Sequence, residues 1–146
     1  ALNPILMPPG DADSFYRIYA SVHTDYALDG EVLLSRQDIR LIRRLVRDLK
    51  FRASPVQVTF DMWDQVCEGE KKYITPYREL ADAQIDTLHL YEPCVFHHFL
   101  LPLREQALDT IHRNKLDSLC RALELIEDID AEEIPKESLL REFIGV

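Results

Sequence analysis

The segment from Ser35 to Arg52 constrains the fold more than any other part of the chain. Apolar residues recur in it at helical spacing and form one stripe along Ile39, Ile42, Val46 and Leu49, widened by Leu41 and Leu45. Ser35 followed by Asp38 is the pattern of a capping box, and Ala53-Ser54-Pro55 marks the end of the segment. We therefore expect an amphipathic helix that must bury one face against the rest of the chain.

Most of the other segments also follow a helical pattern. The expected helices are about 14–27, ended near Gly30; a short one from Thr59 to Gly69; one beginning at Thr75-Pro76; 94–113, kinked at Pro102; one carrying Leu116, Leu119, Cys120, Leu123 and Ile126; and a last one with Leu139, Leu140 and Phe143, stopped by Gly145. Residues 55–60 alternate and form either a short strand or an extended connector. The sequence predicts an all-α, single-domain bundle of six to seven helices, with residues 1–12 as an extended N-terminal segment and residues 13–146 as the helical domain.

Composition limits the class of protein. The 146 residues fit one domain, and 47% hydrophobic with 29% charged residues is ordinary for a globular chain. A net charge of −9 repels nucleic acid and anionic membranes on average, and no apolar run reaches the roughly 20 residues of a membrane span. Three cysteines without a CxxC pair indicate a reducing compartment, and the proline-rich start does not resemble a signal peptide, so we expect a cytoplasmic protein.

Basic residues gather on the expected helix at 35–52. They occupy a sector of roughly 120° opposite the apolar stripe, and they are Arg36, Arg40, Arg43, Arg44, Arg47 and Lys50. This face either pairs with the protein's own acids or binds an acidic or mixed-charge protein surface; nucleic acid is a weaker possibility. Residues 121–146 offer eight acids for internal pairing: Glu124, Glu127, Asp128, Asp130, Glu132, Glu133, Glu137 and Glu142.

A second group of residues suggests metal binding. The segment from His89 to His98 combines histidines with a cysteine and a glutamate, and His89, Cys94 and His97 are weak candidate zinc ligands. Asp109 and His112 share a helix face at i, i+3, with Glu105 in reach, as in helical di-metal sites.

Motifs of known catalytic chemistry are missing from the sequence. It contains no GxSxG, GxxxxGK[ST] or GxGxxG pattern, so we predict no catalytic residues and no cofactor. The expected function is a non-enzymatic protein-binding module, such as an adaptor, a subunit or a toxin-neutralising inhibitor of the immunity type. It would act through the charged helical surface, with Arg40, Arg43 and Arg47 at its centre. The alternative is a metal-binding protein or metal-assisted enzyme centred on the segment from His89 to His98.

Overall fold

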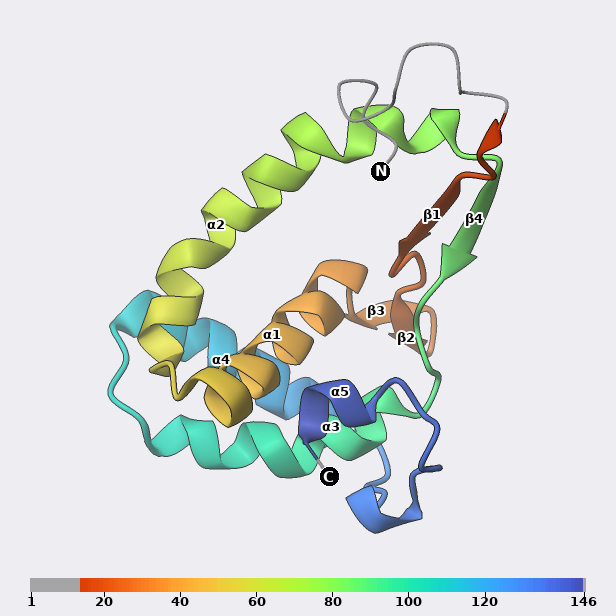
Figure 1. Ribbon diagram of the computed structural model, residues 1–146. Helices are drawn as coiled ribbons and strands as arrows, with labels where there is room; N and C mark the ends of the chain where they lie inside the picture. The colour runs from red at the N-terminus through yellow and green to blue at the C-terminus, as the bar shows by residue number, and fades with distance from the viewer. Residues whose placement is uncertain (1–13, 146) are drawn as a thin grey trace.

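The fold is organised around one long central helix. The computed structural model describes residues 14–145, so the expected extended segment 1–12 lies outside the described residues. The α-helices are α1 (Arg36–Arg52), α2 (Val56–Tyr73), α3 (Glu92–Leu100), α4 (Thr110–Leu123) and α5 (Arg141–Ile144); the strands are β1 (Ile18–Ser21), β2 (Tyr26–Leu28), β3 (Glu31–Leu34) and β4 (Ala83–Asp86); short 3-10 turns are η3 (Thr75–Leu80), η4 (Leu101–Glu105) and η5 (Ala131–Glu133). Figure 1 shows α1 at the centre, with α3, α4 and α5 gathered around it.

Helix α1 confirms the strongest sequence prediction. The Ser35 hydroxyl accepts a hydrogen bond from the Asp38 backbone N–H at 3.2 Å, and the Asp38 carboxylate accepts one from the Ser35 N–H at 3.0 Å. The predicted apolar stripe is buried except at its last residue, Leu49, which is partly buried; Ile39, Ile42 and Val46 are at most 1% exposed. This face packs against α2, α3 and α5, because burying it is the main favourable contribution to folding.

The prediction of an all-α bundle of six to seven helices is wrong. Residues 14–145 contain five α-helices and four short strands, and the strands form two separate two-stranded sheets. The fold is therefore a mixed α/β structure with short sheets.

The helix expected at 14–27 is replaced by β1 and β2. An antiparallel hairpin joins β2 to β3 through Asp29 and Gly30, whose φ angles are 51° and 85°. Two central turn residues with positive φ give a hairpin whose twist matches its strands, and Asp-Gly is a preferred pair for it. Gly30 was interpreted as a helix stop, whereas it is a hairpin turn residue.

The helix expected from Thr75-Pro76 is reduced to the short turn η3 followed by β4. Strand β4 pairs in parallel with β1, aligning Ile18 with Ala83. The Asp82 carboxylate accepts hydrogen bonds from the Arg17 backbone at 2.7 Å and from its guanidinium at 2.9–3.0 Å, which fixes the start of this β1–β4 ribbon. A local pattern could not reveal a partner strand 65 residues away.

Helix α2 is continuous where the sequence suggested a strand or connector and then a short helix. Thr59 does not cap it but is buried inside it, and Gly69 lies within the helix and does not end it. Eighteen residues give a helix about 27 Å long. In Figure 1, α2 leaves the other helices and reaches η3 and the β1–β4 ribbon.

The long helix expected at 94–113 is broken and not merely kinked. Helix α3 ends at Leu100, η4 contains Pro102, and α4 starts after Asp109, whose carboxylate caps it. Proline lacks the N–H that a continuous α-helix needs, so α3 ends in a 3-10 turn and the next helix, α4, begins separately. The final short helix α5 is confirmed, with Gly145 at φ 66° as its stop.

Two glycines should respond in opposite ways to the same substitution. An added Cβ meets no atom within 4 Å at either Gly30 or Gly69, so backbone conformation alone decides the outcome. Gly30→Ala forces alanine to φ +85° and should destabilise the fold by about 1 kcal/mol. Gly69→Ala lies inside α2 and should stabilise it by about 0.5–1 kcal/mol. Urea unfolding of both variants checks this, and shifts of the same sign would contradict the hairpin turn.

Stability at acidic pH should depend on Asp38. Burial alone would raise the pKa of Asp38, but hydrogen bonds from Lys115 and Ser35 outweigh it and hold the pKa below its ordinary value of 3.8. The carboxylate therefore stabilises the fold above pH 3.8, and this contribution disappears as the pH falls through the lower folded-state pKa. The loss of stability in Asp38→Asn should be largest near neutral pH and should shrink below pH 3.8 in urea titrations. Asp64→Asn, at an exposed position of α2, is the control and should show no such trend.

Candidate functional site

The six predicted basic residues of α1 do not form one uniform solvated face. Arg36 and Lys50 are exposed, while the four arginines between them are partly buried. The Lys50 ammonium lies 4.9 Å from the centroid of the Phe99 ring and so contacts the protein's own surface. The four middle arginines are the part that the structure brings together.

Arg43 is committed to internal structure. Its guanidinium pairs with both carboxylate oxygens of Glu92, which is fully buried at the start of α3, and its Nε–Glu92 Oε2 distance is 2.8 Å. It also donates to the Thr87 carbonyl at 2.6 Å. A buried carboxylate needs such a partner, so Arg43 is a structural residue before it can be a binding residue.

Arg44, Arg47 and Arg52 share a single acid. The buried carboxylate of Asp48 lies 3.3 Å from Arg44 Nε, 3.7 Å from Arg47 Nε and 3.1 Å from Arg52 Nη1. It also accepts a hydrogen bond from the Thr59 hydroxyl at 3.2 Å. The Nε atoms of Arg44 and Arg47 are buried but have no hydrogen-bond partner within the described part of the chain. One carboxylate cannot neutralise three guanidinium groups, so this cluster carries excess positive charge.

Arg40 links α1 to the far half of α2. Its guanidinium forms an ion pair with Glu70 and lies 5.8 Å from the centroid of the Trp63 ring. The contact ties α1 to α2 near the C-terminal end of α2, three residues before Tyr73.

These arginines line a pocket of about 190 Å³ with aromatic walls, which we call the aromatic pocket. Its main lining residues are Arg40, Arg43, Arg44, Arg47, Trp63 and Phe143. Planar guanidinium groups beside aromatic rings suit an acidic group carried on an apolar stem. The sequence predicted the arginines but missed Trp63 and Phe143, because only the fold brings α2 and α5 over α1.

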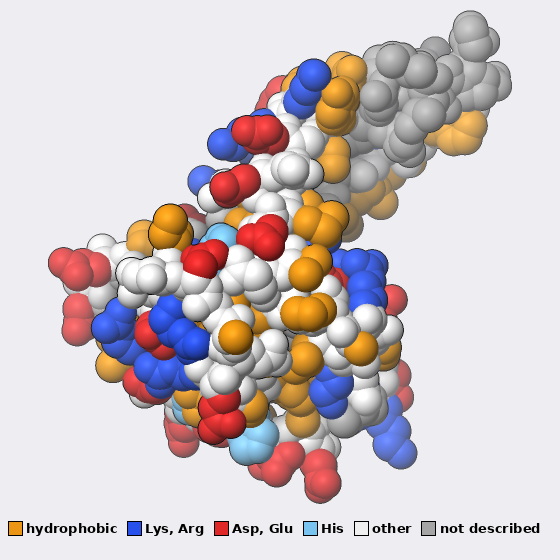
Figure 2. All heavy atoms as spheres, turned by 90° about the vertical axis from the view of Figure 1, so that its left-hand side faces the viewer, with side chains coloured by type: hydrophobic (Ala, Val, Ile, Leu, Met, Phe, Trp, Pro, Cys, Tyr) orange, Lys and Arg blue, Asp and Glu red, His pale blue; other side chains and the backbone are white. Residues whose placement is uncertain are grey.

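The acids that pair with this face are not those expected. The carboxylates come from Asp48, Glu70 and Glu92, and none of the eight acids at 121–146 is among them. Among those eight, Glu124 pairs with Arg104, and Asp128 lies near His97 and His98. On the side shown in Figure 2, acidic and basic side chains are interspersed and not separated into two regions.

The predicted metal candidates do not converge. Among residues 14–145, no set of three ligand atoms joins His89, Cys94 and His97; instead His97 Nδ1 and His98 Nδ1 lie 3.7 Å and 3.5 Å from the Asp128 carboxylate. Burial raises the pKa of the Cys94 thiol, which keeps it protonated and a poor ligand. Burial likewise raises the pKa of Cys67, and that of Cys120 to about 11, so these thiols are not activated nucleophiles.

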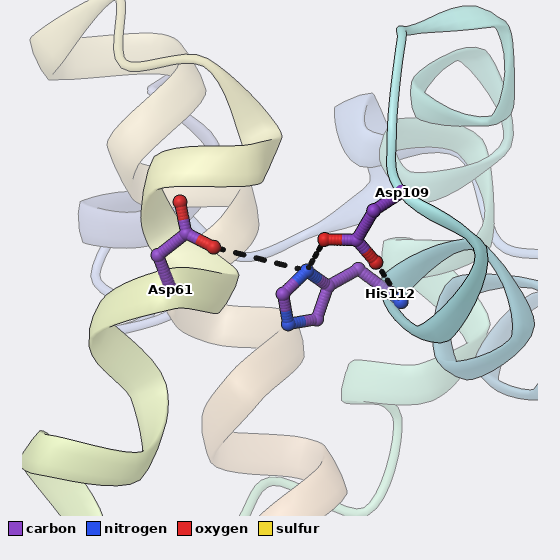
Figure 3. Close-up of side chains that lie close together, drawn as sticks. All are labelled: Asp61, Asp109 and His112. Carbon is purple, nitrogen blue, oxygen red and sulfur yellow. Dashed lines mark hydrogen bonds and ion pairs between the residues drawn. The ribbon is translucent and has the colours of Figure 1, made fainter.

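A different acid–histidine group does form. Asp61 from α2 faces Asp109 and His112 of α4, and the His112 Nδ1 lies 2.7 Å from Asp109 and 3.8 Å from Asp61 (Figure 3). The sequence identified Asp109 and His112 but paired them with Glu105. The side-chain amide of Gln57 donates to both carboxylates, at 2.7 Å and 2.8 Å, and the His112 N–H holds the pKa of the capping Asp109 below its usual range. These groups satisfy one another and the two acids are exposed, so the cluster is explained as a helix cap without an ion.

Comparisons of the chain with protein-family models, curated proteins and solved structures found no match. Within residues 14–145, no helix is both long and apolar enough to cross a membrane. Function must therefore be inferred from the chemistry of the side chains themselves.

The different structural roles of Arg43 and Arg47 should appear as different losses in the free energy of unfolding. Arg43→Ala leaves the Glu92 carboxylate buried without its partner and should lower the free energy of unfolding by about 3–5 kcal/mol. Arg47→Ala removes a half-exposed member of a shared cluster and should cost under about 1 kcal/mol. Urea unfolding at neutral pH gives both values, and equal losses would show that Arg43 does not anchor the fold.

Proposed function

We propose that this protein is a non-enzymatic protein-binding module that receives an acidic segment of a partner against α1 and the aromatic pocket. Adaptors, subunits and inhibitors of the immunity type work in this way. The observation that carries the proposal is the shortage of carboxylates: five arginines of α1 share Asp48, Glu70 and Glu92. The remaining positive charge sits beside Trp63 and Phe143 in an otherwise acidic protein.

The residue types match those that dominate binding energy at protein interfaces. Arginine and tryptophan are enriched among such residues, particularly where a pocket removes them from water. Arg44 and Arg47 line the aromatic pocket and share the single carboxylate of Asp48 with Arg52, so an incoming carboxylate can accept charge-assisted hydrogen bonds from guanidinium groups that have no carboxylate of their own. The excess charge also accelerates encounter with an acidic partner.

Arg44 and Arg47 are the residues to test, because Arg40 and Arg43 bridge to other helices. The probe is a short labelled peptide of glutamates flanking one tryptophan, compared with a peptide in which glutamine replaces each glutamate. Arg44→Gln/Arg47→Gln should weaken binding of the acidic peptide about tenfold or more in fluorescence anisotropy, since charge-assisted hydrogen bonds are lost. Asp48 keeps Arg52 and Thr59 in this variant, so the fold should persist.

The matched control removes the same charge elsewhere. Arg121→Gln/Lys136→Gln changes two exposed basic residues outside the pocket and should leave the affinity unchanged. Equal affinity for the two peptides, or an equal loss in the control variant, would overturn the proposal. A single-stranded oligonucleotide that binds more tightly than the peptide through the same two arginines would also overturn it, in favour of nucleic acid.

A further inference from the structure

A second pocket adjoins the aromatic pocket at Arg40, which lines both. It has a volume of about 230 Å³ and is formed where β1, α1, α2 and η3 meet; we call it the polar pocket. Glu70 lines only the polar pocket and pairs with Arg40, so this ion pair lies at the boundary where the polar pocket adjoins the aromatic pocket.

Besides Arg40, three cations from three different elements line the polar pocket. They are Arg36 of α1, Lys71 of α2 and Arg78 of η3. Within residues 14–145, none of the three side chains has a carboxylate within 4.0 Å. Arg78 donates to the neutral side-chain oxygen of Gln84 at 2.7 Å and lies over the Tyr19 ring at 5.8 Å. The one acid of the lining, Glu70, is already paired with Arg40.

Like charges that converge in a hollow repel one another, and solvent screens them less there than on an open surface. Ser21 and Thr75 add hydroxyl groups to the lining, and a histidine, His23, contributes a buried Nε2 atom that has no hydrogen-bond partner among residues 14–145. The pocket thus offers several positive charges with neutral donors, and it lacks the Trp63 and Phe143 walls of the aromatic pocket. This set suits a compact ligand with several negative charges and several acceptor oxygens, which is the chemistry of a phosphate group.

We propose that the polar pocket binds a phosphate-bearing ligand, with its phosphoryl oxygens held by Arg36, Lys71 and Arg78. The proposal does not rest on binding of an acidic protein segment, because these three cations do not line the aromatic pocket. Glu70 opposes the anion at the boundary, since its carboxylate repels the ligand and occupies Arg40.

The direct test is calorimetric titration of the full chain with inorganic pyrophosphate at constant ionic strength. We expect saturable binding. Lys71→Gln and Arg78→Gln should each weaken it about tenfold, because each removes a charge-assisted contact to phosphate oxygens. Glu70→Gln should tighten it several-fold by removing a negative charge and releasing Arg40.

Two matched controls separate the pocket from net charge. Glu68→Gln makes the same charge change as Glu70→Gln, two residues earlier on α2 at an exposed position that does not line the pocket, and it should leave the affinity unchanged. Arg121→Gln/Lys136→Gln should also have no effect. Absence of saturable binding at pyrophosphate concentrations up to about 5 mM, or equal effects in test and control variants, would overturn the proposal.

The source of the phosphate group is distinguished by competition. A phosphoserine peptide is compared with free phosphate as a competitor of pyrophosphate. If the peptide displaces pyrophosphate at the lower concentration, a protein presents the phosphate group. Tighter binding of pyrophosphate than of the peptide shows a small-molecule ligand. A glutamate peptide that displaces pyrophosphate as effectively as the phosphopeptide would overturn the phosphate assignment. The two proposals can also fail independently. The variant Arg44→Gln/Arg47→Gln should lose binding of the glutamate peptide and keep its affinity for pyrophosphate.

Discussion

The contact between Arg43 and Glu92 holds the central helix against the start of α3 and the segment that follows β4. Glu92 has no exposed surface, and its carboxylate also accepts the His89 backbone N–H at 3.0 Å. Arg43 additionally holds the Thr87 carbonyl, directly after β4. One guanidinium thus joins the central helix, the start of α3 and the segment leaving the β1–β4 ribbon. Because a buried carboxylate without its cation is strongly unfavourable, these three parts can move only together.

The distribution of charge matters more here than its total. The chain carries 26 acidic and 17 basic residues, yet only three carboxylates pair with five of the six arginines of α1. Ion pairing to buried acids fixes some of these arginines as parts of the fold. Arg44 and Arg47 retain positive charge in the aromatic pocket, and Arg36, Lys71 and Arg78 retain it in the adjoining polar pocket. A protein that is acidic on average can therefore carry a locally cationic surface, and local charge decides which groups can approach it.

The sequence predicted those features of the fold and the candidate site that depend on interactions between residues close together in the chain. The capping box of Ser35 and Asp38 and the stripe of α1 lie within one helix, and both were predicted correctly. The β1–β4 ribbon requires pairing between residues 18 and 83, so the local pattern that predicted a helix at 14–27 was misleading there. The Asp29-Gly30 hairpin signal was present but was interpreted as a helix stop. Likewise, the sequence predicted that the arginines of α1 share one face of a helix. It did not predict the aromatic walls of the pocket, because Trp63 and Phe143 reach that face only through the positions of α2 and α5 in the fold.

The parallel ribbon also sets an order of events during folding. Strands β1 and β4 join parts of the chain 65 residues apart through only four residue pairs, and Ile18, Ala20 and Ile85 in them remain exposed. Closing so long a loop costs conformational entropy that the small buried area of the ribbon hardly offsets, so we expect the ribbon to form after the helices have assembled. The same imbalance makes it the first tertiary contact to open, and its amide protons exchange with solvent sooner than those of α1. The wall of the polar pocket contributed by Tyr19 and Ser21 thus belongs to the least stable part of the fold, where ligand binding would add the most order.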